Sequence, residues 1–540
     1  MDLTKVNFPN LLEQLTNIGI SLSAEKDHSR LLESILRKAM ELTNADGGTL
    51  YTRTDDNHLQ FEIMITQSLG IYKGGASGKP IDFYPISLYD QNHIPNTHMV
   101  ASWAVLHGRT VNIEDAYADL QFDFSGTREF DKKTGYRSKS FLTVPLTNHE
   151  NENIGVLQLL NAQDPESGQP CPFSLLDQQV VESLASQAAV TVTNRSLIDA
   201  QKDLFDAMIK LIANAIDEKS AYTGGHCRRV PALTNMIAEA ACNIDFGPLK
   251  DFSLDDNEKY ALDVAGWLHD CGKITTPEYV VDKATKLETI FDRIEMIKTR
   301  FATLRQEAEI RMLRRVMQAQ GIHEIPVDTL FQEEIRCLDE ENEFIKKINI
   351  GGESTSEDDK QKVQEIAKRQ WTEIDGKRSN LLTENETQNL MIGRGTLTVR
   401  ERQIINNHIS VTINMLESLP YPKHLRNVPE YAGGHHEKMD GTGYPRGLNR
   451  EQMSIPARIM AIADIFEALT AADRPYKKAM PLSRALTILG RMKLDHHIDP
   501  DLFDLFIREK IYLRYAEQYL SGEQIDDFDI TAIPGYTPYH

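Results

Sequence analysis

The first part of the chain combines helical and strand-like hydrophobic patterns. Two amphipathic stretches, "LLEQLTNIGISLSA" and "HSRLLESILRKAMELTNA", predict helices over residues 11–24 and 28–45. Four short apolar or alternating runs follow: "GGTLYTRT", "QFEIMITQS", "KSFLTVPLTN" and "NIGVLQLLNA". The polar turn "NHENE" joins the last two runs and indicates a β-hairpin. Residues 1–176 therefore predict an α+β domain, with an antiparallel sheet and flanking helices.

From residue 177 to 218 the pattern becomes continuously helical. Apolar residues recur at intervals of seven, at Val190, Leu197, Leu204 and Leu211. Met208 and Ala215 fall at the offset of a second seam, which Gln201 interrupts. Such a stripe predicts a connecting helix that pairs in parallel with a second copy, as in a homodimer. The alternative is a long amphipathic helix buried against its own domain, and the pattern favours neither.

Residues 205–520 predict an all-α domain with an insertion at about 285–395. In "LETIFDRIEMIKTRFATLRQEAEIRMLRRVMQA" the apolar residues alternate in steps of three and four, and they predict a helical hairpin. The members of this seam are Leu287, Ile290, Ile294, Ile297, Phe301, Leu304 and Ala308. The stretch "GGESTSEDDKQK" is interpreted as a charged, solvated loop of the insertion. Residues 521–540 form a C-terminal tail.

Composition narrows the class of protein. A chain of 540 residues is too long for one hydrophobic core and predicts two or three domains. The start "MDLTKVNFPN" has no secretion signal, and no apolar run reaches the roughly 18 residues of a membrane helix. The five cysteines show no paired close spacing, which is typical of reduced thiols. These features together predict a cytoplasmic protein without membrane insertion. The net charge of −21 argues against binding to nucleic acid, but bound cations would still permit a small anionic ligand.

Residues that bind metals in other proteins recur through the second half of the chain. They lie in "YTGGHCRRV", "GWLHDCGKI", "RQIINNHISVT", "GGHHEKMDGTGYP" and "RIMAIADIFEALT", and they are His226, His269, Asp270, His408, His435, His436 and Asp464. A lone histidine in a helical pattern is more often a core residue. Asp464, however, lies in an apolar segment, where a buried carboxylate needs a cation or several donors. These seven residues are enough to bind two metal ions and to leave each ion a coordination position for water or substrate. A second pair, His496 and His497, lacks the glycine-rich context and is interpreted as structural.

The series resembles the HD-GYP family of metal-dependent phosphodiesterases, which open cyclic di-GMP. Its marker motifs are a histidine before "RV", then "HDxGK", a solitary histidine, "HHE" with "DGxGYP", and an aspartate before "DRPY", and all are present in that order. The resemblance implies that the seven residues bind two divalent metal ions, iron or manganese, with Asp270 as the bridge. It also implies that Lys273 holds a phosphate oxygen and that Tyr444 contacts the same phosphate or its guanosine.

The chain departs from the family pattern at two positions. Members with a third metal have a glutamate about one helical turn before the first histidine, where this chain has Tyr222. Glu218 lies a further turn away, so two metals are expected and a third is not. Glu467 replaces an aspartate that commonly follows the last ligand, and it is expected to pair with Lys273. The turn around Tyr444 is predicted to be tight and rigid because of Gly441, Gly443 and Pro445.

The stretch "FDKKTGYRSKSFLTVPLTNHENENIGVLQLLNA" resembles a GAF domain, as found in cyclic-nucleotide phosphodiesterases and many bacterial sensors. Asn161, Phe173 and Asp177 match a motif of the nucleotide-binding members. Ala162 and Gln178 replace the lysine and glutamate of that motif, so its lysine–aspartate ion pair cannot form. Two alternatives stay open: a domain that binds a small molecule or cyclic nucleotide, and a dimerisation module without a ligand.

Together these resemblances imply an enzyme that hydrolyses cyclic di-GMP to linear pGpG under the control of the GAF-like domain. Further cleavage to GMP is left open. Water activated by the metals would attack phosphorus in line with the departing 3′ oxygen, while Lys273 stabilises the developing negative charge. The alternatives are a catalytically weak sensor of cyclic di-GMP and a hydrolase of the mixed cyclic GMP–AMP dinucleotide.

Overall fold

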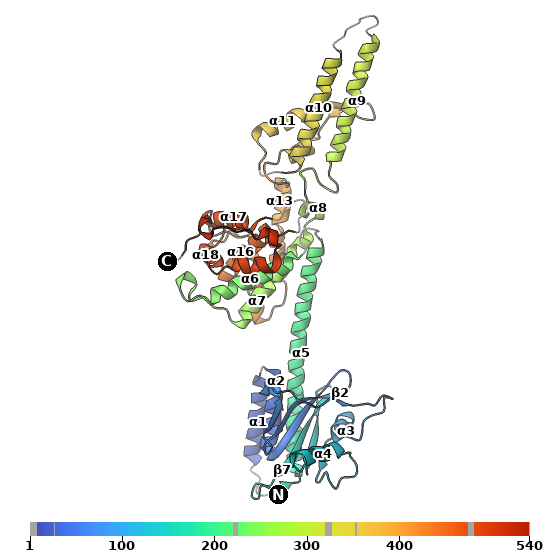
Figure 1. Cartoon of the computed structure of the whole chain (residues 1–540), viewed down its shortest axis with the longest axis vertical. Coiled ribbons are helices and arrows are strands. Elements are labelled where there is room, and N and C mark those ends of the chain that lie inside the picture. The colour runs from blue at the N-terminus through green and yellow to red at the C-terminus, as the bar shows by residue number, and fades with distance from the viewer. Residues whose placement is uncertain are drawn as a thin grey trace. The chain divides into compact units, whose positions relative to one another are not determined.

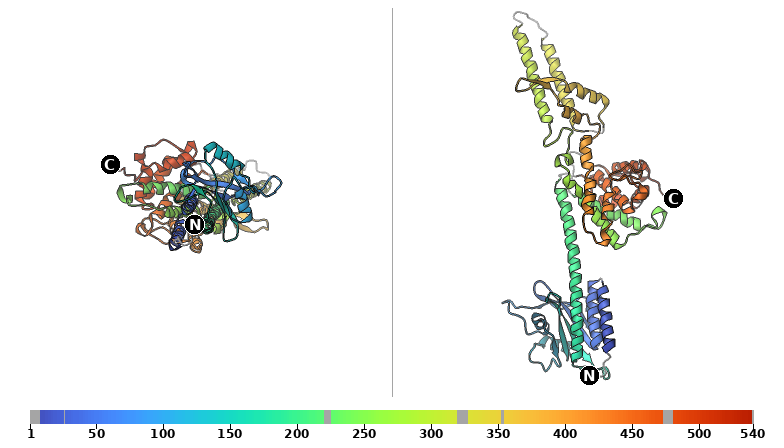
Figure 2. Two further views of the ribbon diagram at one scale, coloured as in Figure 1. Left: turned by 90° about the horizontal axis from the view of Figure 1, so that it is seen from below. Right: turned by 180° about the vertical axis from the view of Figure 1, so that it is seen from behind.

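The computed structural model describes residues 8–25, 27–219, 225–318, 327–351, 354–472 and 480–538, with the side chains of residues 8–12 and 327–328 excepted. The chain divides into two compact units, Met1–Phe205 and Asp206–His540 (Figure 1, Figure 2). The division falls within one helix, α5, which spans Leu175–Lys219. Among the described helices, none combines the length and the apolar character needed to cross a membrane.

The first unit is built on an antiparallel sheet with the strand order β3-β2-β1-β7-β6-β5. The hairpin predicted from "NHENE" is β6–β7, in which Val144 lies opposite Leu157. Two short strands extend the sheet, β4 beside β2 and β8 beside β7. The strands are β1 Ala45–Arg53, β2 His58–Thr66, β3 Ile71–Gly74, β4 Ile86–Ser87, β5 Val111–Ile113, β6 Phe141–Thr147, β7 Asn153–Gln163 and β8 Pro170–Cys171.

Helices cover both faces of this sheet, which confirms the predicted α+β domain (Figure 1). On one face lie α1 (Phe8–Ala24), α2 (His28–Thr43) and the first part of α5. Their apolar side chains share one core with the sheet, as in the cluster of Leu36, Leu157 and Leu184. On the other face lie α3 (Val100–His107) and α4 (Ser125–Thr134), over two smaller clusters.

The burial of side chains changes along helix α5. Its first part belongs to the core of the first unit through Val181, Ala188 and Val192. Further along, the residues of the seven-residue repeat are exposed: 57% for Leu197, 63% for Leu204 and 68% for Leu211. The alternative of a buried helix therefore describes the first part of α5 and one face of its last part, where Ile209, Ala213 and Ile216 are buried. Pairing of the exposed stripe with a second copy stays a prediction.

The second unit has an all-α core, as predicted. Its helices are α6 His226–Cys242, α7 Asp256–Leu268, α14 His408–Glu417, α15 Val428–Gly433, α16 Ile455–Thr470, α17 Leu482–Leu494, α18 Pro500–Arg508 and α19 Ile511–Tyr519. A short 3₁₀ helix, η4 (Cys271–Thr275), follows α7. The C-terminal segment packs against this core, because the buried Gln524 side chain donates to the carbonyl oxygens of Thr470 and Met480.

The insertion follows α8 (Glu278–Val281) and has a hydrophobic core of its own, which includes Leu287, Phe301, Ile345 and Leu390. Its long helices α9 (Ile294–Gln318) and α10 (Val327–Asn349) pack together. The other elements are α11 Glu357–Ala367, the antiparallel strands β9 Gln370–Thr372 and β10 Arg378–Asn380, and α12 Glu384–Leu390. Helix α13 (Val399–Asn406) then leads back to the core of the unit.

Two expectations about the insertion are wrong. Ile290 does not belong to the apolar seam, because it is 96% exposed and precedes α9, whose first residue Ile294 donates its N–H to the Asp292 carboxylate. The stretch predicted as a charged loop contains the start of α11. Ser356 and Asp359 form a capping box there, in which each side chain accepts a hydrogen bond from the backbone N–H of the other residue.

The two ends of the insertion meet at Lys283. The Thr396 hydroxyl donates to the Lys283 carbonyl oxygen at 2.9 Å. The Lys283 ammonium is buried and donates to both carboxylate oxygens of Glu401 at 2.9 Å and to Asn389 Oδ1 at 2.8 Å. The segment that enters the insertion is therefore held directly to the segment that leaves it.

Candidate metal centre

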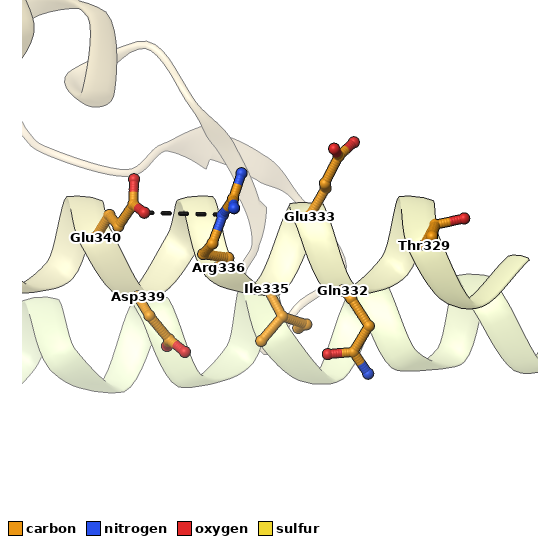
Figure 3. Close-up of a pocket in the computed structure, with 7 residues that line it drawn as sticks. All are labelled: Thr329, Gln332, Glu333, Ile335, Arg336, Asp339 and Glu340. Atoms are coloured by element: carbon orange, nitrogen blue, oxygen red, sulfur yellow. Dashed lines mark ion pairs between the residues drawn. The ribbon is translucent and has the colours of Figure 1, made fainter.

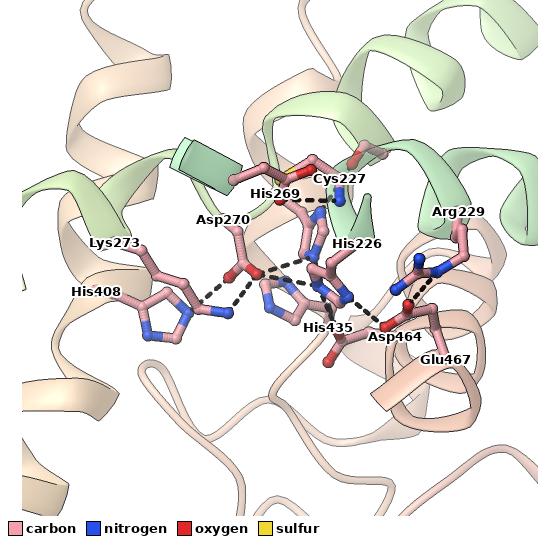
Figure 4. A network of polar contacts seen from close by, with 12 residues as sticks. His226, Cys227, Arg229, His269, Asp270, Lys273, His408, His435, Asp464 and Glu467 are labelled. Carbon is pink, nitrogen blue, oxygen red and sulfur yellow. Dashed lines mark hydrogen bonds and ion pairs between the residues drawn. The ribbon is translucent and has the colours of Figure 1, made fainter. Parts of the chain in front are cut away.

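All seven predicted metal ligands lie together in the second unit, in two neighbouring groups. Figure 4 labels six of them, all except His436. In each group the metal-binding atoms lie within 4.8 Å of one another. The first group is His226, His269, Asp270 and Asp464, and the second is His408, His435 and His436. The motifs therefore converge from segments far apart in the chain, including segments on both sides of the insertion.

Helix ends position most of these side chains. His226 begins α6, His269 follows the last residue of α7, and His408 begins α14. The adjacent pair His435 and His436 follows α15, whereas Asp464 lies inside α16. A residue at a helix end can turn its side chain toward a point that several helices share, so this arrangement suits a site built between helices.

A close approach between η4 and α14 joins the two groups. The Gly272 N–H donates to Thr412 Oγ1 at 2.9 Å. A Cβ atom on Gly272 would lie only 2.0 Å from the carbonyl oxygen of His408 and 2.6 Å from the backbone nitrogen of Thr412. Glycine is therefore the residue that lets the turn after Asp270 pack directly on the helix that carries His408.

Asp270 faces both groups with its two carboxylate oxygens. Its Oδ2 lies 3.2 Å from His226 Nε2 and 3.3 Å from His269 Nε2, whereas its Oδ1 lies 3.1 Å from His408 Nε2. Burial by itself would raise the pKa of Asp270, but the charges of Lys273 and His269 outweigh burial and hold this pKa well below its usual range. An ionised carboxylate between two sets of imidazoles has the geometry of a bridging ligand.

Three imidazole rings are fixed in the orientation that a metal ligand requires. Nδ1 of His269, His408 and His435 each donates to the carbonyl oxygen three residues earlier in the chain, at 2.7, 2.5 and 2.6 Å respectively. In the metal-bound state, the proton on Nδ1 would leave the lone pair of each ring on Nε2. Hydrogen bonds of this kind set the tautomer of metal-bound histidines in other proteins.

The donor atoms fit metal ions. Within the described ranges, the buried atoms without a hydrogen-bond partner include Asp270 Oδ1 and Nε2 of His226, His269, His408 and His435. Burying such atoms unpaired is costly, and a cation bound in each of the two groups would give them partners. Burial also lowers the pKa of His436 to about 4 and that of His435 well below its usual value, so both rings are neutral near pH 7 and able to bind a metal.

The expected ion pair between Glu467 and Lys273 is not formed. Glu467 instead pairs with Nδ1 of His226 and accepts a hydrogen bond from Arg229 Nε at 2.6 Å (Figure 4). Lys273 donates to Asp270 Oδ2 at 2.5 Å. The reason is that Glu467 lies one turn beyond Asp464 on the side of α16 that packs against α6, where it meets His226 and Arg229.

Changing Glu467 to glutamine should weaken metal binding about 10- to 100-fold, as is typical when a partner of a ligating histidine is altered. The amide keeps the size of the side chain but loses the negative charge that holds the His226 ring. Metal titration of the purified chain measures the effect. Glu430, a carboxylate that accepts two hydrogen bonds from Ser454, provides the control: Glu430→Gln should leave metal affinity unchanged. Equal affinities for Glu467→Gln and the unaltered chain would contradict the prediction.

The turn after the histidine pair is held by a residue that motif reasoning did not single out. Glu437 is fully buried and accepts hydrogen bonds from the N–H groups of Arg446 at 2.7 Å and Leu448 at 2.9 Å. The turn it closes places the Tyr444 ring against His436, with 4.9 Å between ring centroids and 23° between planes. Glu437 is the last residue of the "HHE" motif, and this membership could have marked it as part of the site from sequence alone.

The backbone of this turn requires glycine at both predicted positions. Gly441 has φ +77°, a conformation that side chains disfavour. A Cβ atom on Gly443 would lie 2.4 Å from the backbone nitrogen of Lys438. The Tyr444–Pro445 peptide bond is cis.

Several other predicted positions lie apart from the cluster. His496 is exposed, and neither it nor His497 belongs to either ligand group. Tyr222 and the "DRPY" motif at residues 473–476 lie outside the described residues. A pocket on α10 of the insertion contains none of the predicted site residues. Figure 3 shows the residues that line it, which are Thr329, Gln332, Glu333, Ile335, Arg336, Asp339 and Glu340.

The candidate ligand motif of the first unit makes internal contacts. Asn161 Oδ1 accepts a hydrogen bond from the Lys139 N–H at 2.7 Å. Phe173 is part of the hydrophobic core. Asp177 accepts hydrogen bonds from the N–H and hydroxyl of Ser174, both at 2.7 Å, at the start of α5. All three side chains thus have a structural role, and a ligand of this domain stays a prediction.

Comparison with protein families identifies a domain in each unit. Residues 27–192 match the family model described as "GAF domain". Residues 383–502 match the model described as "HD domain", a range that contains His408, His435, His436 and Asp464. The chain therefore contains a GAF domain followed by an HD domain, as the motifs predicted. The first three ligands along the chain, His226, His269 and Asp270, precede the matched range.

Curated relatives match shorter stretches. A 3′3′-cGAMP-specific phosphodiesterase 3 of Vibrio cholerae is 44% identical over 109 residues, 20% of this chain and 23% of the relative. A cyclic di-GMP phosphodiesterase of Pseudomonas aeruginosa is 43% identical over 74 residues, 14% and 17% of the two chains. One of Thermotoga maritima is 38% identical over 131 residues, 22% and 35% of the two chains. Each of these matches covers at most 35% of the relative's length.

Proposed function

We propose that this chain is a metal-dependent phosphodiesterase that hydrolyses cyclic di-GMP to linear pGpG. The observation that carries the proposal is the position of Asp270, whose two oxygens face two separate groups of buried donor atoms. A site for two neighbouring cations suits the displacement of one oxygen by another at phosphorus. The names of the curated relatives support a cyclic dinucleotide as substrate.

The residues of the centre divide between two divalent cations, with iron or manganese preferred. His226, His269 and Asp464 would hold the first cation, His408, His435 and His436 would hold the second, and Asp270 would contribute to both. Such cations lower the pKa of water and neutralise charge on phosphoryl oxygens. The histidine-rich donor set with one shared carboxylate suits first-row ions of this kind.

Two further side chains act on the substrate. Lys273 reaches the centre with its ammonium group 2.5 Å from Asp270 and would hold a phosphate oxygen as negative charge develops there. Tyr444 lies against His436 and would contact the same phosphate or its guanosine. Burial, together with the charges of Asp464 and Asp270, raises the pKa of Tyr444 to about 12, so its hydroxyl stays protonated and able to donate.

The mixed cyclic GMP–AMP dinucleotide is the second candidate substrate. Two relatives, both from Vibrio cholerae, are named 3′3′-cGAMP-specific phosphodiesterases, and they are 44% and 46% identical over 109 and 81 residues. The metal centre would treat both dinucleotides alike, since each presents the same phosphodiester. Choice between them would depend on contacts with the second base.

Regulation would come from the GAF domain, in a cytoplasmic homodimer. The support for self-association is the exposed stripe of Leu197, Leu204 and Leu211 on α5, whose spacing suits a parallel coiled coil. A small molecule or cyclic nucleotide bound by the GAF domain would then act on the HD domain through α5, the helix that both units share.

Metal content and turnover test the proposal together. Elemental analysis of the purified full chain should find two iron or manganese ions per chain. Incubation with cyclic di-GMP, and separately with 3′3′-cGAMP, followed by chromatography should yield a linear product. A chelator should abolish turnover and added manganese should restore it. Bound metal without turnover of either dinucleotide would instead favour a sensor, and a chain without metal would contradict the proposal.

A further inference from the structure

We propose that the last turn of α5 positions the metal centre, through Asp217 and Lys219. The inference rests on the proposed function, because it concerns the geometry of the same site. Neither residue is among the predicted ligands or substrate contacts. Both belong to the final turn of α5, and each binds the backbone of a different segment that carries metal ligands.

Lys219 holds the segment that follows Asp270. Its ammonium group donates to the carbonyl oxygens of Ile274 at 2.5 Å, Thr276 at 2.7 Å and Lys273 at 3.3 Å. These carbonyls lie at the end of η4, where the last carbonyl groups of a helix have no partner within it; that of Lys273 also accepts a hydrogen bond from the Thr276 N–H at 3.0 Å. An ammonium group has three N–H donors, so one side chain satisfies all three acceptors. Lys219 therefore sets the position of the turn that begins at Asp270.

Asp217 holds the segment that carries His226. Its carboxylate accepts hydrogen bonds from the N–H of Gly225 at 3.0 Å and of Cys227 at 3.4 Å, the residues on either side of His226. Gly225 is the N-cap of α6 and has no side chain to cap the helix. Asp217 supplies the missing acceptor, and its negative charge also suits a helix N-terminus.

The two contacts fix the separation of ligands from different segments. His226 Nε2 and Asp270 Oδ2 lie 3.2 Å apart, and both belong to the first ligand group (Figure 4). Because Asp217 and Lys219 are only two residues apart in one helical turn, a shift of that turn moves both segments. A change of a few tenths of an ångström is enough to alter how well the donor atoms fit a cation.

The same helix also belongs to the core of the first unit, through Val181, Leu184 and Ala188. Peptide bonds and helical hydrogen bonds connect those residues to Asp217 without a break, since α5 is one helix from Leu175 to Lys219. A rearrangement of the GAF domain core that displaces α5 would therefore also move Asp217 and Lys219, and with them the segments that carry the metal ligands. Asp217 and Lys219 act as positioning residues and need no contact with substrate.

Kinetics of the full chain test this inference. Changing Lys219 to methionine should lower kcat about tenfold with KM changed by less than about twofold, because ligand geometry is disturbed while substrate contacts remain. Lys219→Arg, which keeps a donor to the carbonyls, should recover most of kcat. Lys210→Met is the matched control, an exposed lysine of the same helix, and should behave as the unaltered chain. Unaltered kcat in Lys219→Met would overturn the inference.

A second readout does not depend on turnover. Cobalt(II) loaded into the purified chain has visible absorption bands that report the arrangement of its ligands. These bands should shift in Lys219→Met and in Asp217→Asn but not in Lys210→Met. Unshifted bands in both variants would overturn the positioning role even if the chain hydrolysed neither dinucleotide. If the unaltered chain bound no cobalt, the proposed metal centre itself would be contradicted.

Discussion

Replacing Asp270 by asparagine is expected to remove metal from both groups of ligands and to lower kcat/KM at least about a thousandfold, equivalent to about 4 kcal/mol of transition-state stabilisation. The carboxylate faces both groups, with Oδ2 toward His226 and His269 and Oδ1 toward His408. An amide has one oxygen and one NH₂ group. Whichever way it turns, the NH₂ group occupies a position where a cation is expected.

Elemental analysis and turnover of Asp270→Asn measure the effect. The matched control is Asp263→Asn in the preceding helix, which makes the same change of charge at a carboxylate bonded to Asn235 at 2.7 Å. The control should retain both metals and activity within about twofold, since an amide oxygen can still accept that hydrogen bond. Retention of two metals by Asp270→Asn would show that this residue is not a bridge.

Replacing Gly272 by alanine is expected to be nearly as damaging, although the side chain it adds is a single methyl group. The methyl carbon would lie 2.0 Å from the His408 carbonyl oxygen and 2.6 Å from the Thr412 nitrogen. Both are backbone atoms within a helix, so relief requires η4 to move away from α14. That movement would separate Asp270 from His408. We expect the free energy of unfolding to fall by about 3 kcal/mol and metal bound to the second group to be lost.

Denaturant unfolding and metal analysis of Gly272→Ala separate these two effects. Gly393→Ala is the control, because the added methyl group meets nothing within 4 Å there and the backbone conformation does not require glycine. It should change stability by less than about 0.5 kcal/mol. Unaltered stability and full metal content in Gly272→Ala would contradict the prediction, because they would mean that η4 and α14 can separate without cost.

Most of the candidate ligands could be predicted because they lie in short motifs that can be read without knowledge of the fold. The solitary His408 was predicted only from its place in the series of motifs. Their division into two groups was not predictable, because it depends on which helix ends meet. The position of Glu467 illustrates this limit. Its spacing from Asp464 places both residues on one side of α16. Only packing against α6 determines that the neighbours of Glu467 are His226 and Arg229 instead of Lys273.

The fold followed the hydrophobic pattern closely where secondary structure is regular. The hairpin β6–β7 and the helices α1 and α2 are close to the predicted ranges. The error in the insertion arose where side chains cap the start of a helix. Ser356 and Asp359 start α11 inside a run of charges that resembles a loop, although the spacing of serine and aspartate is that of a capping box. Asp217 and Lys219 went unnoticed because their partners are backbone groups, which no side-chain pattern reveals.

The contact at Lys283 bears on the order in which the HD domain folds. Residues that build one metal centre are separated by the whole insertion, from His269 to His408 along the chain. Closing a flexible loop of that length would cost roughly 4 kcal/mol of chain entropy. The insertion has its own core and holds its two ends together through Lys283, Thr396 and Glu401. If the insertion folds first, the later steps would meet a short connection in place of a long loop, and the insertion would serve as a template for assembly of the metal centre.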